Sequence, residues 1–134
     1  MPRMCEAMAV SSIQVADETF VAASPAAVGR AVGDRACWRR WFPDLFLDVV
    51  EDRTDKGVRW TVAGAANGTM EIWLEPVLDG VVLHYFLHAE PAGDTARMNL
   101  AAINHRRRVA GKRMAFEVKN TLEASRPVGA PPAV

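Results

Sequence analysis

The sequence predicts an α+β fold in which a long C-terminal helix packs on a curved antiparallel sheet of about five strands. Residues 96–123 carry apolar side chains at helical spacing, so this stretch reads as one helix that closes the chain. The residues before it alternate in short runs separated by turn sequences, which is typical of an antiparallel sheet. Two short helical stretches follow only the first strand, so helices lie at the ends of the sheet sequence.

The first strand and two short helices begin the domain. Residues 12–22 form the first predicted strand. Ser24-Pro25 then marks the start of a helix, because serine caps free backbone N–H groups and proline suits the first turn. A second short helix over 36–42 is expected to end at Pro43.

The remaining strands are expected to follow one another as a meander. They cover 45–52, 58–64, 69–77 and 81–90. Asn67-Gly68 is a strong hairpin signal, because both residue types tolerate positive φ. Asp79-Gly80 gives a second signal of the same kind. If both are two-residue loops, they fix the register of the last hairpins.

The long helix is expected to start with Asp94 or Thr95 as its cap. Its apolar stripe should face the sheet. That stripe comprises Leu100, Ile103, Ala110, Met114, Val118 and Leu122. A second, narrower stripe comprises Met98, Ala102, His105, Val109 and Phe116. Either the short helices or another chain should cover this second stripe, and we favour another chain.

Composition indicates one domain and excludes several classes of partner. We expect a flexible leader over 1–11, one domain over 12–124 and a disordered tail over 125–134. The formal net charge is zero, so charge does not favour nucleic acid as a partner. No apolar run is long enough to span a membrane. The two cysteines suggest neither a disulfide framework nor a metal site, so we expect a cytoplasmic protein without a cofactor.

The outer face of the sheet is expected to carry an interface. The Asp79-Gly80 register sets Glu75 opposite His84, Trp73 opposite Phe86, and Glu71 opposite His88. Exposed aromatic side chains often mark a contact surface, so we expect a homodimer interface at Trp73, Phe86, His84 and His88. A Glu–His pair can orient a general base, but cross-strand polar pairing explains these residues better. A metal is not favoured, because no fourth ligand is in sight.

Three local motifs resemble the START-like superfamily, also called the polyketide cyclase/dehydrase, Bet v 1-like or SRPBCC group. The first is the strand that runs into the Ser-Pro helix start at 20–28. The second is the aromatic-proline end of the second short helix at 38–43. The third is the strand at 68–76, which is followed by the Asp79-Gly80 turn and another strand. The resemblance covers about 12–123 and implies a helix-grip fold with an apolar cavity between sheet and helix. The family usually has more strands than we count here, so this chain resembles a shortened member.

The resemblance, the smoother apolar face of the last hairpin and the stripe of the long helix together indicate the residues of the cavity. They are Trp38, Trp41, Phe42, Ile72, Leu74, Tyr85, Leu87, Ile103, Arg107 and Met114. Trp60 either joins the aromatic residues of the cavity or lies on the outer face with Trp73, and the Asn67-Gly68 register favours the outer face because it sets Val62 opposite Trp73. Arg107 is unusual in the middle of an apolar stripe. It either anchors the carboxylate or carbonyl of a ligand, or pairs with an acid such as Glu51, or extends past the sheet edge.

These observations favour one function over two others. We expect the chain to bind a small hydrophobic ligand, such as a lipid, an isoprenoid or a polyketide-like molecule. The first alternative is an aromatase/cyclase-like enzyme, with Tyr85 as an acid and Arg107 as a carbonyl anchor. The second is a dimeric interaction protein whose cavity is filled by side chains.

Overall fold

The computed structural model describes residues 11–124 and confirms the predicted fold class. The strands are β1 (Ile13–Val21), β2 (Leu45–Asp52), β3 (Gly57–Gly64), β4 (Ala66–Val77) and β5 (Gly80–Pro91). The helices are α2 (Pro25–Val32), α3 (Arg35–Trp41) and α4 (Leu100–Glu123), with short 3₁₀ helices η1 (Thr54–Lys56) and η2 (Gly93–Arg97). No helix in this part of the chain is long and apolar enough to cross a membrane.

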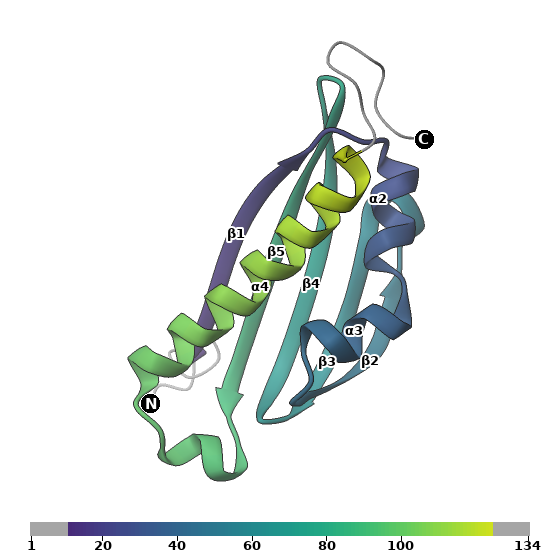
Figure 1. Ribbon diagram of the computed structural model, residues 1–134. Coiled ribbons are helices and arrows are strands. Elements are labelled where there is room, and N and C mark those ends of the chain that lie inside the picture. Colours follow the sequence, from purple (N-terminus) through teal and green to yellow (C-terminus); the bar gives the residue numbers. More distant parts are fainter. Residues whose placement is uncertain (1–10, 125–134) are drawn as a thin grey trace, which may run out of the picture.

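One antiparallel sheet, in the order β1-β5-β4-β3-β2, forms the base of the molecule. Figure 1 shows the helices on one face of this curved sheet, with α4 along the β1 side and α2 and α3 over the other half. We call the helix-covered face the inner face. Its side chains alternate with solvent-facing ones along each strand, and they form a single core with the helices.

The β3–β4 turn differs from the prediction. Asn67 and Gly68 lie inside β4, where Gly68 pairs with Val62. The turn instead occurs at Gly64, whose φ of 102° is a conformation that glycine adopts without strain. Trp60 therefore pairs with Met70, and its side chain lies fully buried on the inner face rather than the outer one. Its placement beside Trp73 was wrong because the turn forms before the Asn-Gly pair.

The β4–β5 hairpin is shifted by two residues from the predicted register. Its loop is Leu78-Asp79, and Leu78 adopts a positive φ of 54° with its side chain in solvent. Trp73 therefore pairs with His84 rather than with Phe86. Because side chains alternate with a period of two, this shift changes every pair but keeps each residue on its predicted face.

Helix α4 begins later than predicted. Residues 93–97 form η2, and Asn99 caps α4 by accepting a hydrogen bond from the Ala102 N–H at 3.0 Å. Neither Asp94 nor Thr95 is the cap. The predicted second stripe of α4 is partly exposed, and its largest side chain, Phe116, is 48% exposed. The short helices leave this stripe uncovered, and its coverage by another chain stays a prediction.

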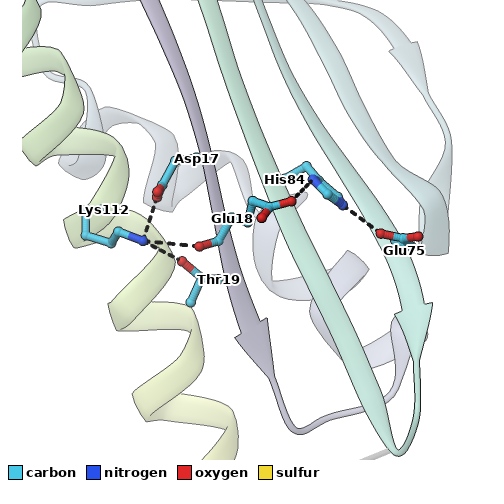
Figure 2. Close-up of polar contacts among 6 residues, drawn as sticks. All are labelled: Asp17, Glu18, Thr19, Glu75, His84 and Lys112. Carbon is cyan, nitrogen blue, oxygen red and sulfur yellow. Dashed lines mark hydrogen bonds and ion pairs between the residues drawn. The ribbon is translucent and has the colours of Figure 1, made fainter.

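Polar side chains of α4 hold the helix to the edge strand β1. Figure 2 shows Lys112 reaching β1, where its Nζ lies 2.8 Å from Asp17 Oδ2 and donates to Thr19 Oγ1 and the Glu18 carbonyl. Lys119 donates in the same way to the Phe20 carbonyl at 2.7 Å. These backbone acceptors point away from β5, so α4 satisfies groups that an edge strand would otherwise leave unpaired. These contacts fix the position of α4 beside β1.

Candidate functional site

A groove of about 640 Å³ lies between α3 and α4, and we call it the α3–α4 groove. Its wall combines the end of α3, the segment after it, the region of η2 and one side of α4. The lining residues are Arg40, Trp41, Pro43, Asp44, Thr95, Met98, Ile103, Arg106, Arg107, Ala110, Arg113, Met114 and Glu117. Its volume is in the range of small-molecule sites, about 300–1,000 Å³.

Four of the ten predicted cavity residues line this groove: Trp41, Ile103, Arg107 and Met114. The other six are buried outside its wall; they are Trp38, Phe42, Ile72, Leu74, Tyr85 and Leu87. The Phe42 and Tyr85 rings stack with centroids 6.0 Å apart, filling the space between the α3 end and the sheet. The open groove thus lies in the helix layer, between α3 and α4, and not between the helices and the sheet.

Two tryptophans support the α3 wall of the groove. Trp38 packs edge-on against Trp60, with ring centroids 5.1 Å apart. The Trp38 indole N–H also donates to the Val32 carbonyl at 2.7 Å, which ties α3 to the end of α2. Because Trp60 projects from β3, this contact positions α3 on the sheet and leaves the groove on its other side.

Arg107 forms a bidentate ion pair with Asp44 inside the groove. Its Nη1 and Nη2 donate to the two Asp44 carboxylate oxygens at 3.0 and 2.6 Å. The Arg107 side chain is only 10% exposed, whereas that of Asp44 is 49% exposed. The partner acid is therefore Asp44, which the sequence reasoning missed, and not Glu51, which pairs with Arg53. The pair explains how a charge fits within the apolar stripe.

This ion pair predicts an acid-dependent loss of stability. Burial raises the pKa of Asp44, but the hydrogen bonds and charge of Arg107 outweigh it and hold the pKa below its usual value. A lowered folded-state pKa means that the pair stabilises the protein above about pH 4 and loses this effect as the pH falls further. Asp44→Asn should cost about 1–2 kcal/mol at neutral pH, a value discounted for the exposure of Asp44.

Urea denaturation of the wild type and the variant between neutral and acidic pH measures this difference. The two free energies of unfolding should converge as the pH falls, because protonation removes the same charge. Asp48→Asn, at an exposed position of β2, serves as the control and should change stability little. A difference between wild type and Asp44→Asn that is independent of pH would contradict the role of the carboxylate charge.

The rim of the groove is rich in arginine. Arg40 forms an ion pair with Glu117, and that hydrogen bond lowers the pKa of the Glu117 carboxyl. Arg106 and Arg113 complete the rim, and both are exposed. The sequence reasoning treated the arginines at 106–108 as a solvated surface. The seven-residue spacing of Arg106 and Arg113 could have indicated that the two side chains lie on one side of the helix.

The Tyr85 hydroxyl is buried beneath α4. It finds no hydrogen-bond partner within residues 11–124. Burial raises the pKa of Tyr85 well above its usual value, against an opposing effect of the Arg107 charge. Such a phenol keeps its proton, and the residue is not part of the groove wall. Its geometry is that of a core side chain under Gly111, whose missing side chain makes room for the ring.

Three of the four predicted interface residues, Trp73, His84 and Phe86, stack together on the outer face. His84 is buried between the rings of Trp73 and Phe86, with centroids 4.5 and 6.2 Å away. Figure 2 shows its two ring nitrogens facing Glu18 and Glu75, at 3.4 and 2.9 Å. Trp73 is 40% exposed and His88 is exposed. Their use as a dimer interface stays a prediction. The described residues hold no cluster that fits a metal ion.

Comparisons with known proteins support the fold. No protein-family model matches the chain, and no curated protein sequence matches it. The solution structure of the Aha1 dimer from Colwellia psychrerythraea is similar, with a TM-score of 0.58 and 15% identity over 86% of this chain and 99% of that one. Mll3558 from Rhizobium loti has a TM-score of 0.58 and 17% identity over 78% and 95% of the two chains.

The structure of Ara h 8.0201 is also similar, with a TM-score of 0.52 and 14% identity over 84% of this chain and 97% of that one. These likenesses support the fold described above, in which a long helix packs on a curved antiparallel sheet. At such low identity they concern the fold alone.

Proposed function

We propose that the chain binds a small hydrophobic ligand in the α3–α4 groove. The groove itself carries this proposal, because it is an open space of ligand size whose deeper wall is apolar. Ile103 and Met114 form the buried part of that wall, and Trp41 and Met98 keep exposed apolar surface in the groove. A ligand that covers Trp41 and Met98 removes this exposed apolar surface from water, at about 25 cal/mol per Å².

Binding without catalysis is the function that the groove chemistry supports best. An aromatase/cyclase-like reaction needs a proton donor and a carbonyl anchor in contact with the substrate. Tyr85 lies outside the groove wall, and Arg107 is already held by Asp44. Tyr85 is thus not presented to a ligand, and Arg107 reaches the groove with its guanidinium already paired to a carboxylate.

A variant that fills the groove tests this function. Ala110 lies on the groove wall, so Ala110→Phe should place a ring in the ligand volume and weaken binding of the neutral dye Nile red by about tenfold. Ala102→Phe, on an exposed part of α4, is the matched control and should bind as the wild type does. Fluorescence titration measures both, after circular dichroism has shown that the variants fold.

Two results would reject the groove as the binding site. One is an absence of dye binding to the wild type together with no bound lipid in native mass spectrometry after incubation with a lipid extract. The other is equal affinity of the Ala110→Phe and Ala102→Phe variants, which would place the bound dye elsewhere.

A further inference from the structure

We propose that the ligand of the α3–α4 groove carries an anionic head group, a carboxylate or a phosphate monoester, which Arg106 and Arg113 bind at the rim. This inference rests on the proposed function, because it names the chemical class of the ligand for the same site. It goes beyond that function because an apolar wall alone favours neutral molecules as much as charged ones.

The charges of the groove are unbalanced. Its wall contains four arginines but only two carboxylates. Glu117 is bound by Arg40, and Asp44 is bound by Arg107. Within residues 11–124, no acidic side chain forms an ion pair with Arg106 or Arg113. The charge of Arg106 contributes to lowering the pKa of Asp44, but the groove still carries two more positive than negative charges, although the whole chain has a formal net charge of zero.

The positions of these two arginines suit an anion. They are seven residues apart on α4, so they lie about 10 Å apart along the same side of the helix. Ala110 lies between them, and its small side chain leaves the space over the helix open. Two long side chains on either side of a gap can converge on one anion, and guanidinium groups match carboxylate and phosphate oxygens in bidentate geometry.

The apolar wall lies behind this pair of charges. Ile103 and Met114 are buried residues of the same helix, and Trp41 and Met98 line the same groove with apolar surface that is still exposed. A ligand with its head group at the rim and its apolar body against this wall satisfies both surfaces. Amphipathic acids have this division of charge and apolar surface, whereas neutral apolar molecules leave the arginines unused.

Three ligands with the same alkyl chain test the inference: dodecanol, dodecanoate and dodecyl phosphate. Each is titrated at neutral pH, below its aggregation concentration, by displacement of Nile red. We expect the two anions to bind the wild type at least about tenfold more tightly than dodecanol, and added salt to reduce this preference. The relative affinities of dodecanoate and dodecyl phosphate distinguish a carboxylate ligand from a phosphate ligand.

The double variant Arg106→Gln/Arg113→Gln should lose the preference for anions and still bind dodecanol. Arg39→Gln/Arg108→Gln removes the same charge from exposed positions of α3 and α4 outside the groove wall, so it should keep the preference. Equal binding of the alcohol and the acids by the wild type would overturn the head-group inference alone, as would an unchanged preference in the rim variant. If none of the three ligands binds the wild type or displaces Nile red, the proposed function is overturned together with the head-group inference.

Discussion

Replacing Trp60 with alanine is expected to lower the free energy of unfolding by about 4 kcal/mol, the cost typical of deleting a large buried aromatic side chain. Trp60 is 0% exposed and lies between β3 and α3. The substitution also removes its edge-on contact with Trp38. Because that contact supports the α3 wall, we expect weaker Nile red binding as well as lower stability.

Urea denaturation followed by circular dichroism measures this loss. Trp73→Ala is the matched control, because Trp73 is a tryptophan of the next strand that faces outward and is partly exposed. It should cost about 1 kcal/mol, mostly from its stacking on His84. Similar losses for the two variants would contradict the inward placement of Trp60.

The second large effect is expected at Gly111, where α4 crosses Tyr85. A Cβ atom at this position would lie 2.5 Å from Tyr85 Cε2, closer than such contacts allow. The ring has little freedom to move, because it is buried and stacked on Phe42. We therefore expect Gly111→Val to cost about 3 kcal/mol through overpacking. Gly111→Ala should destabilise by a smaller amount, although alanine favours helices by about 1 kcal/mol over glycine.

A double-mutant cycle identifies the cause of this effect. Tyr85→Leu removes the ring, so Gly111→Ala should become neutral or stabilising in that background, with a coupling of about 1–3 kcal/mol. Ala102→Val, at an exposed site of the same helix, controls for a branched side chain on α4. If Gly111→Ala stabilises the protein with Tyr85 in place, α4 does not approach the sheet as closely as described.

The fold class was predictable because it depends on patterns that act over short distances. The apolar spacing of α4 and the alternation of the strands each follow from local geometry, and both appear in the structure. The Ser24 cap of α2 is equally local, and its hydroxyl accepts from the Ala27 N–H as such a cap should. Even the two-residue error at the β4–β5 loop left every side chain on its predicted face.

The β3–β4 turn shows where local signals fail. Asn67-Gly68 is a strong turn sequence, but the chain turns at Gly64, where the Ala65 N–H donates to the Asp44 carbonyl. That bond joins the turn to the segment between α3 and β2, which lies far away in sequence. Because the turn was predicted at the wrong residues, Trp60 was assigned to the wrong face of the sheet. This one register error is the reason why the prediction lacked a residue that supports the α3 wall of the groove.

The sequence by itself determined the layers of this protein: which segments are helices or strands, and which side of the sheet is apolar. Only the tertiary structure decided the register of β3 on β4, the filled space around Phe42 and Tyr85, and the open groove between α3 and α4. The tertiary structure alone also decided that Arg107 pairs with Asp44. The physical reason is that periodicity acts between neighbours in the chain, whereas a cavity and a charge balance depend on side chains that folding brings together from distant segments.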